Sequence, residues 1–450
     1  MDVTIVALGR RLRAFLRSPH KLQKLQDSFH DLGWRALTIW SRWRLKGYHG
    51  RLITITGTKG KTTTARLISR IFADAGYQVG TACSGGVYVN GRCVLRGPFS
   101  GADGPIRACR AGGRDLLVLE TAHGGIQRYG FGFSGCDVAI FTNITDGHLG
   151  ELGIETLEEM LALKWRLAST IRPGGTVILN ADDPLLAALR PPQGVAVVYV
   201  SLTGGLTRGN ADIEAPLYQC SDHGTVVKAC AGFSSTVAEV PDAPLLGKGF
   251  ASYNAYNLLA AVACVEALDR FLPVSRESLL KSLLSFGAVP DDNPGHFNLF
   301  EGSRGRVLLL GGSNRDSYQR DAQALARIRA CQPFPVGRIV GVITAIGMQS
   351  TSYIRDLVGI VATVCDEVII REPLPRYRYG KAPGAISSIL KTAALESGIP
   401  HHAIRICDET SDLIEDVILP SGESDFLFAV FCAFAQEPIV ELCRRLGRLG

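Results

Sequence analysis

The sequence predicts an α/β protein: a short basic helical arm, a central domain with a mostly parallel sheet, and a smaller open α/β domain. Three observations predict this. Short apolar β-branched segments alternate with longer amphipathic ones, the alternation resumes after the segment PDDNPG, and the excess positive charge lies at the N-terminus. Such alternation is typical of a parallel sheet covered by helices on both faces. The predicted boundaries are 1–50 for the arm, 51–295 for the central domain and 296–450 for the C-terminal domain.

The N-terminal arm accounts for the whole net charge. Residues 1–51 hold 11 Lys and Arg against 3 Asp and Glu, whereas the rest of the chain holds 37 against 39. Apolar residues recur there with helical spacing, which predicts two basic amphipathic helices. Three interpretations stay open: a cap packed on the body, a dock for a partner or an acidic polymer, and a helix in peripheral contact with a membrane.

Both domains are expected to alternate strands with helices. Residues 198–247 differ, because their short Thr-, Gly- and Val-rich runs predict a few antiparallel strands before a helix over 251–270. The segment 290–295 is expected to be the hinge. Further strands are expected at 52–56, 116–120, 138–144, 176–180, 306–312, 338–344, 367–372, 403–407 and 425–433, and further helices at 321–331 and 383–397.

The segment RLITITGTKGKTTTAR, which begins at Arg51, predicts a nucleotide site. A buried strand ends there in a short glycine turn, and an amphipathic helix follows directly. Phosphate oxygens need several N–H donors aimed at one point, and a glycine turn entering a helix supplies them. Lys61 is then expected to reach the terminal phosphates and Thr62 to hold Mg²⁺. The predicted nucleotide-binding residues of this P-loop are Gly57, Thr58, Lys59, Gly60, Lys61, Thr62 and Thr63.

Four further polar residues are candidates for the same site, each with a plain structural alternative. Glu120 ends a predicted buried strand, where ligands bind in open α/β sheets, and is either a Mg²⁺ ligand or a helix cap. His148 follows the next strand and is either a metal ligand or a structural histidine. Lys164 lies on the apolar side of a helix, where a lysine is ordinarily a stem with its charge in solvent. Asn254 either bonds a base or caps a helix.

Composition argues against several other classes. No run of eighteen uncharged apolar residues occurs, and no cleavage site follows an apolar N-terminal core, so neither a transmembrane helix nor a secretory signal is expected. The 12 cysteines form no C-x-x-C pair, which disfavours a zinc site and a disulfide framework and predicts a cytoplasmic protein. The neutral body lacks a basic-aromatic motif, so no nucleic-acid partner is expected.

Several segments together resemble the Mur ligase superfamily of ATP-dependent amide ligases, and within it the Mur-type half of cyanophycin synthetases. The resemblance rests on GTKGKTTT, ETAHGGIQRYGFGFSGCDVAIFTNITDGHLG, NADDP, PGHFNLFE and DEVIIRE, and extends from Arg51 to about Phe434. It does not include the ATP-grasp half of those synthetases, for which residues 1–50 are too short.

The resemblance implies an ATP-dependent ligase with a C-terminal domain of Rossmann-like architecture. ATP would phosphorylate a substrate carboxylate, and an amine would then displace the phosphate. Lys61 would hold the β- and γ-phosphates, and Thr62 with Glu120 would bind one Mg²⁺. His148 would bind a second Mg²⁺, supported by Lys164 in carbamylated form. Asn254 would face the adenine, and closure of the C-terminal domain would gate catalysis.

The sequence departs from the family pattern at four places. His123 replaces an arginine, and Gly147 precedes His148 where the family has aspartate. His296 replaces an arginine that contacts phosphate, so it is expected to line the nucleotide site. The segment 311–316 (GGSNRD) replaces the motif Asp-Tyr-Ala-His-Asn-Pro, with Arg315 and Asp316 as candidates to compensate.

The expected substrates are a small amine or amino acid and an acidic peptide or polymer, which the basic arm could hold. Two other functions stay open. One is a non-catalytic nucleotide-binding subunit that partners a separate ATP-grasp ligase. The other is a P-loop ATPase or kinase coupled to a different event.

Overall fold

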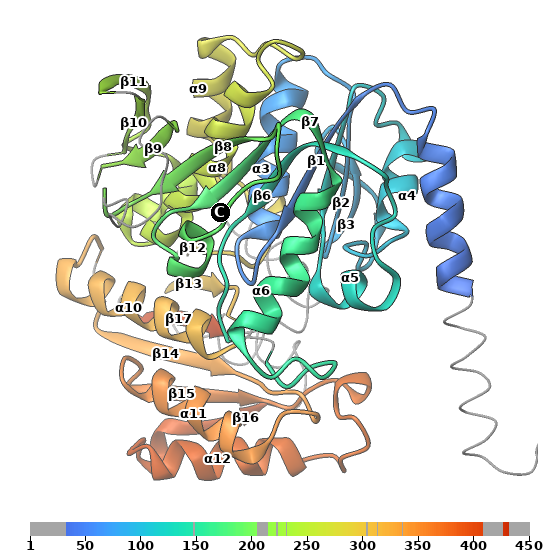
Figure 1. Ribbon diagram of the computed structural model, residues 1–450. Coiled ribbons are helices and arrows are strands. Elements are labelled where there is room, and N and C mark those ends of the chain that lie inside the picture. The colour runs from blue at the N-terminus through green and yellow to red at the C-terminus, as the bar shows by residue number, and fades with distance from the viewer. Residues whose placement is uncertain are drawn as a thin grey trace, which may run out of the picture.

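The computed structural model contains two sheets, an 11-stranded one above a 6-stranded one in Figure 1, both covered by helices. It describes residues 33–146, 149–204, 215–221, 224–230, 232–302, 305–312, 314–334, 336–407 and 426–431. The strands of the large sheet lie within residues 51–239 and those of the small sheet within 298–431. The boundary at residue 295 stays a prediction.

The large sheet has the strand order β11-β10-β9-β8-β7-β6-β1-β5-β2-β3-β4. Its middle, from β9 to β2, is parallel, and antiparallel hairpins extend it at both edges. The strands are β1 (Arg51–Thr56), β2 (Val79–Cys83), β3 (Gly86–Val89), β4 (Arg92–Arg96), β5 (Leu116–Glu120), β6 (Cys136–Phe141), β7 (Ile171–Asn180), β8 (Ala196–Ser201), β9 (Leu217–Cys220), β10 (Thr225–Cys230) and β11 (Phe233–Glu239).

Helices cover both faces of the large sheet because its central strands are apolar on both sides. Ile53 and Ile55 of β1 pack into one core with three helices, α3 (Lys61–Asp74), α8 (Ala255–Ala267) and α9 (Arg276–Ser285). Leu52, the residue before Ile53, points to the other face of the strand and packs into the opposite core. The helices there are α4 (Gly104–Ala111), α5 (His123–Tyr129), α6 (Leu157–Trp165) and α7 (Pro184–Ala187).

The small sheet has the order β12-β13-β17-β14-β15-β16, and only β12 is antiparallel to its neighbour. Three helices share one apolar core with it: α10 (Arg315–Cys331), α11 (Thr351–Ala362) and α12 (Ala385–Glu396). Its strands are β12 (Asn298–Gly302), β13 (Gly305–Leu310), β14 (Arg338–Ile343), β15 (Glu367–Arg371), β16 (Ile404–Cys407) and β17 (Phe426–Phe431). Short 3₁₀ segments lie at Arg166–Thr170, Pro244–Gly249, Ser252–Asn254, Pro290–Asp292, Pro375–Tyr377 and His401–Ala403.

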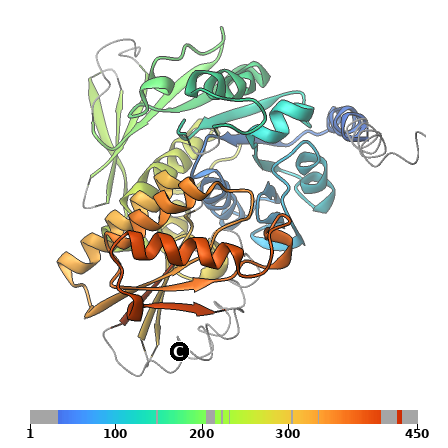
Figure 2. The ribbon, with the colours of Figure 1, turned by 90° about the horizontal axis from the view of Figure 1, so that it is seen from below.

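The described part of the basic arm, residues 33–45, is a helix at the periphery of the molecule beside α4 (Figures 1 and 2). It packs on the body: Ser41 Oγ donates to the carbonyl of Gly132 at 2.7 Å, and the Trp34 and Tyr129 rings stack at 5.2 Å. The two helices predicted in the arm lie outside the described residues, apart from residues 33 and 34. In the part of the chain that the structure describes, no helix combines the length and apolarity needed to cross a membrane.

The predicted fold class is confirmed, and most expected strands occur near their predicted positions. Three expectations were incomplete. The hairpin strands β2, β3 and β4 and the edge strand β12 were not predicted. Strand β8 joins the parallel part of the sheet, because it pairs with β7 in parallel. Helix α10 begins at Arg315, before the predicted 321, because Asn314 and Ser317 form a capping box.

Candidate nucleotide and metal site

The loop between β1 and α3 has the conformation that a phosphate site requires. Gly57 and Gly60 both have positive φ, 139° and 83°. A Cβ atom on Gly57 would meet Thr142 Oγ1 at 2.0 Å, and one on Gly60 would meet Asn257 Oδ1 at 2.2 Å. Only glycine therefore fits at either position. The N-terminus of α3 is consequently open toward any ligand held by the loop.

Asn143, beyond β6, holds this loop in place. Its carbonyl accepts from Thr58 N at 2.9 Å, and its side-chain Oδ1 accepts from Lys59 N at the same distance. Lys61 Nζ folds back onto the carbonyl of Thr58 at 2.9 Å. Burial lowers the pKa of Lys61, and the Glu120 carboxylate opposes this effect. The loop is thus preorganised, with an ammonium poised beside it.

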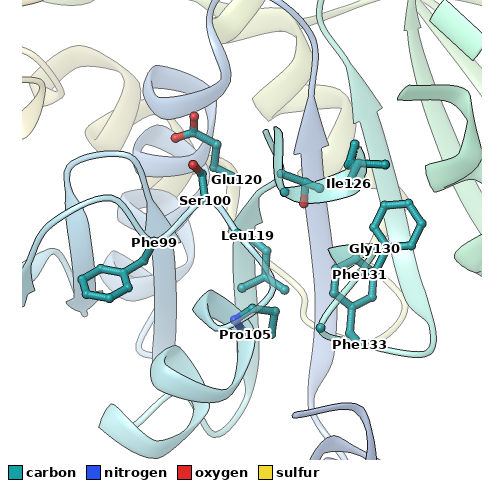
Figure 3. Close-up of a pocket in the computed structure, with 13 residues that line it drawn as sticks. Phe99, Ser100, Pro105, Leu119, Glu120, Ile126, Gly130, Phe131 and Phe133 are labelled. Atoms are coloured by element: carbon teal, nitrogen blue, oxygen red, sulfur yellow. The ribbon is translucent and has the colours of Figure 1, made fainter. Parts of the chain in front are cut away.

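Glu120 is the anchor of a small oxygen-rich cluster at the carboxyl end of β5. Thr62 Oγ1 donates to its Oε2 at 2.7 Å, Ser84 N donates to the same atom at 2.9 Å, and Ser84 Oγ donates to Oε1 at 2.7 Å. The carboxylate is 4% exposed. Figure 3 shows it pointing away from a neighbouring apolar cavity of about 10 Å³, into which Leu119 projects. That cavity is too small for a substrate.

This donor set fits Mg²⁺. One carboxylate and two hydroxyls are hard oxygen donors, and Mg²⁺ is commonly bound by one or two carboxylates together with substrate phosphates and water. Within the described ranges, no group of three or more His, Cys, Asp and Glu side chains could hold a metal by itself. A cation here would therefore share its coordination with a nucleotide. His148, the other predicted ligand, lies outside the described residues.

Lys164 lies beneath the loop rather than at the protein surface. It is 1% exposed, and its Nζ donates to the carbonyl of Gly57 at 3.0 Å. Burial lowers its pKa well below 10.5, and the nearby Lys61 adds to this effect while Glu120 opposes it. The solvent-directed alternative is therefore wrong for Lys164. A lysine whose pKa is lowered in this way becomes a neutral, reactive amine more readily than a lysine in solvent.

A cleft of about 230 Å³ lies between the loop and the small sheet. The predicted residues Thr58, Lys59, Gly60, Lys61, Thr62, Thr63, Glu120, Asn254 and His296 all line it. Gly57 and Lys164 lie behind the loop. The structure thus gathers the predicted site residues that it describes into one place, although nothing in it tests their roles.

Asn254 is buried, and its side-chain amide is already engaged. Its Nδ2 donates to the carbonyl of Leu245 at 3.0 Å, and its Oδ1 accepts from Asn257 Nδ2 at 2.9 Å. Asn257 Oδ1 accepts in turn from Thr64 Oγ1 at 3.1 Å. The side chain does not cap α8. These bonds fix the orientation of the Asn254 side chain at the cleft wall. Its contact with a base stays a prediction.

The far wall of the cleft is built by β13 and α10. Asp321 is 4% exposed, and its Oδ2 has no hydrogen-bond partner among the described residues. The Asp321 side chain occupies the space next to Gly312: a Cβ atom on residue 312 would lie 2.9 Å from Asp321 Oδ2. Burial raises the pKa of Asp321 to about 7, against the opposing charge of Lys59. Burial lowers the pKa of Lys59 to about 8, and Asp316 and Asp321 oppose that shift.

Neither of the two candidates for compensation in the altered segment 311–316 lines this cleft. Arg315 faces Asp356 at 3.9 Å, and Asp316 pairs with Arg320 at 3.2 Å. Arg320 and Asp321 line the cleft in their place. His123, which replaces the family arginine, lies 3.1 Å from Glu151.

Among the cleft residues, sequence reasoning missed Ser84 and Asp321, and it noted Asn257 only as part of the start of a helix. A signal existed for Ser84, because it directly follows a strand that neighbours the one ending in Glu120. Asn257 lies one helical turn after Asn254 in an otherwise apolar helix, which is also a visible signal. Asp321 had none, because its place depends on how α10 packs.

Comparison with known proteins agrees with this site. Residues 55–265 match the family model of the Mur ligase middle domain. The chain is 29% identical to cyanophycin synthetase of Synechocystis sp., over 80% of this chain and 40% of that protein. It is also 29% identical to a UDP-N-acetylmuramoylalanine–D-glutamate ligase of Chlorobaculum parvum, over 66% of this chain and 58% of that one. The chain thus spans two fifths of the length of the cyanophycin synthetase.

Solved structures show the same fold. A bifunctional folylpolyglutamate synthase/dihydrofolate synthase from Yersinia pestis, solved with AMPPNP and a manganese ion, has a TM-score of 0.61. The match covers 92% of this chain and 93% of that one at 16% identity, which establishes the fold alone. The predicted resemblance to the Mur ligase superfamily is confirmed.

Proposed function

Starting from the Mur ligase middle domain that residues 55–265 carry, we propose that the protein is an ATP-dependent ligase joining a carboxylate to an amine. One observation carries the proposal. The cleft brings a glycine-turn phosphate loop, a buried Glu120 and the lowered-pKa Lys164 to one edge of the sheet. A binding module needs the loop, but it has no use for the other two.

The reaction begins with transfer of the γ-phosphoryl group of ATP to an oxygen of the substrate carboxylate, which releases ADP. The amine nitrogen then attacks the acyl carbon, a C–N bond forms, and the C–O bond to phosphate breaks. One proton leaves the nitrogen, and inorganic phosphate is released. Charge on the transferring group must be neutralised throughout, so catalysis depends on the positioned cations and N–H donors of this chain.

The roles follow from the positions of the side chains. The N–H groups of residues 60–62 bind phosphate oxygens, and Lys61 leaves the Thr58 carbonyl to reach the terminal phosphates. Thr62 and Glu120 would hold Mg²⁺, which supplies Lewis-acid stabilisation of the phosphoryl oxygens when bound. His148 is proposed as a ligand to a second ion. Asn254 and His296 are proposed to border the nucleotide at the cleft walls.

Lys164 is proposed to act as a carbamate. A neutral Nζ attacks CO₂, an N–C bond forms, and one proton is released, which converts a buried base into a buried carboxylate. Its lowered pKa favours the neutral amine that this step needs. The resulting anion would lie near Lys61, whose positive charge stabilises it.

The proposed substrates are an amino acid or small amine and an acidic peptide or polymer. The relatives named above support this choice, because one is a cyanophycin synthetase and the other is a ligase of UDP-N-acetylmuramoylalanine and D-glutamate. We propose a cytoplasmic location, which supplies ATP. A separate ATP-grasp ligase remains a proposed partner.

Phosphate release from Mg-ATP, measured over a matrix of amino acids and short acidic peptides, tests the function. The ligase requires release that depends on both an amine and a carboxylate and is lost in Lys61→Ala. Release that needs no amine would identify an ATPase or kinase. Tight ATP binding without turnover in any mixture would instead identify a non-catalytic nucleotide-binding subunit.

A further inference from the structure

The helix of residues 33–45 has one face on the protein and one face in solvent. The packed face includes Ser41, which is fully buried, and Leu45, which joins the core of the large sheet. Arg42 Nε also donates to the carbonyl of Phe131 at 2.6 Å. These contacts fix the rotation of the helix about its axis. The residues that face outward are therefore held there.

Two large apolar side chains lie on the outward face. Ile39 is 68% exposed and Trp43 is 61% exposed. They are four residues apart and so lie one above the other on the helix surface. Arg35 and Lys46, both exposed, extend the same stripe at its two ends. An exposed apolar pair between two cations is costly in water and calls for a partner that is both apolar and anionic.

More positive charge surrounds this stripe. The guanidinium groups of Arg44 and Arg110 lie over the same Trp40 ring, at 5.9 and 5.6 Å from its centroid. Arg114, after α4, is also exposed. Within the part of the chain that the structure describes, Arg35, Arg44, Lys46, Arg110 and Arg114 form no ion pair with a carboxylate. Like charges gathered without anions repel one another, so an external anion would stabilise them.

We propose that this face docks the protein on an anionic membrane surface, with Ile39 and Trp43 entering the interface and the surrounding Arg and Lys side chains contacting lipid phosphates. A lipid interface offers both chemistries at once, apolar chains beneath anionic head groups. An acidic polypeptide offers only the charge, and a second copy of this face would bring cations together. The inference goes beyond the proposed ligase and does not depend on it.

The sequence ahead of the helix extends the same character. Residues 1–32 contain six Lys and Arg against three Asp and Glu, with apolar residues at helical spacing. Stable peripheral binding requires more than one weak signal. A basic amphipathic segment next to an exposed Ile–Trp pair supplies two, which is why the full chain is needed in the test.

The test is cosedimentation of the full-length protein with vesicles of phosphatidylcholine alone or mixed equally with phosphatidylglycerol. Binding is expected to the mixed vesicles only and to weaken at high salt. Ile39→Ala with Trp43→Ala should weaken it by roughly tenfold per side chain. Arg35→Glu with Lys46→Glu should weaken it by roughly fivefold per residue. Phe233→Ala and Lys281→Glu are matched controls, because both side chains are exposed elsewhere, and they should bind as the wild type does.

Three outcomes would overturn the proposal. One is no binding to either kind of vesicle. A second is binding that the four substitutions leave unchanged. A third is binding to poly-glutamate in solution without binding to vesicles, which would identify the face as a dock for an acidic polypeptide. Circular dichroism of each variant separates loss of binding from loss of folding.

Discussion

Replacement of Lys164 by methionine should change the stability of the fold little and the activity strongly. The Lys164 side chain is 1% exposed, and its Nζ donates a hydrogen bond to the Gly57 carbonyl. Replacing a buried ion by an apolar side chain of similar volume typically ranges from neutral to stabilising by about 4 kcal/mol. Leaving the Gly57 carbonyl without this donor costs about 1–3 kcal/mol. The stability of the variant in CO₂-free buffer should therefore stay within about 3 kcal/mol of that of the wild type, in either direction.

The pH dependence of the difference gives a second readout. Because the folded-state pKa of Lys164 is lowered from 10.5, the unfolded chain binds more protons between the two values. Wild-type stability therefore rises with pH through this window, and methionine removes that contribution. The stability of Lys164→Met relative to the wild type should be greatest below the lowered folded-state pKa and should decrease as the pH rises toward 10.5.

Activity should fall much more than stability changes. If Lys164 supports the metal site as a carbamate, Lys164→Met should lower the rate of phosphate release by about 10²–10³-fold. Added bicarbonate should raise the melting temperature of the wild type and leave that of the variant unchanged, since a ligand that binds only the folded state stabilises it.

Urea unfolding at several pH values and a coupled phosphate assay measure these quantities. Lys228→Met is the matched control, because its Nζ lies 2.6 Å from Glu266 Oε2 and its loss should not stabilise the fold. The reasoning is refuted if Lys164→Met destabilises the protein by several kcal/mol and loses activity only in proportion to unfolding. Lys164 would then be a structural lysine.

Three further predictions concern the side chains of Ser84, Asp321 and Asp137. Ser84→Ala removes the hydroxyl that donates to Glu120 Oε1, so the Mg²⁺ concentration for half-maximal phosphate release should rise about 10-fold. Ser84→Thr should restore the wild-type value, and an unchanged Mg²⁺ titration in Ser84→Ala would exclude Ser84 from the site. Asp321→Asn should stabilise the fold by up to about 4 kcal/mol above pH 7 and by little near pH 4, because the folded-state pKa of Asp321 is raised from 3.8 to about 7. Equal denaturation midpoints of the variant and the wild type at pH 8 would contradict this. Asp137→Ala should destabilise the protein by about 3–5 kcal/mol in thermal unfolding, since Arg51, Arg172 and Leu52 N all donate to its buried carboxylate, while the activity of the folded fraction stays unchanged.

The central strands and the phosphate loop were predictable because their signal is local. Each buried parallel strand is a short β-branched run, and the loop residues follow one another in the chain. The hairpin β2–β4 gave no such signal. Its strands are 4–5 residues long, and all five residues of β4 are exposed, so no continuous apolar run marks it.

The parts of the site that escaped prediction depend on packing between distant segments. Lys164 could be suspected from sequence only by family resemblance, because nothing in LEEMLALKWRL shows that the lysine lies under a loop more than a hundred residues away. Asp321 reaches the cleft because α10 packs over Gly312, which leaves room for its carboxylate. The spacing of residues along the chain predicts neither the position of Lys164 under the loop nor that of Asp321 in the cleft.

Helix α3 connects the phosphate loop to the predicted hinge. Its first turn faces the cleft, while the next turns hold the segment 291–293: Arg66 Nε donates to the carbonyl of Asp292 at 2.5 Å, and Thr63 Oγ1 bonds to Asn293. Arg70 adds an ion pair to Asp292 at 3.3 Å. Because His296 follows this segment within a few residues and lines the cleft, a shift of α3 on binding phosphate would be transmitted to the predicted hinge and from there to the start of the C-terminal domain. Closure of the cleft and occupation of the loop would then be mechanically linked through one rigid helix.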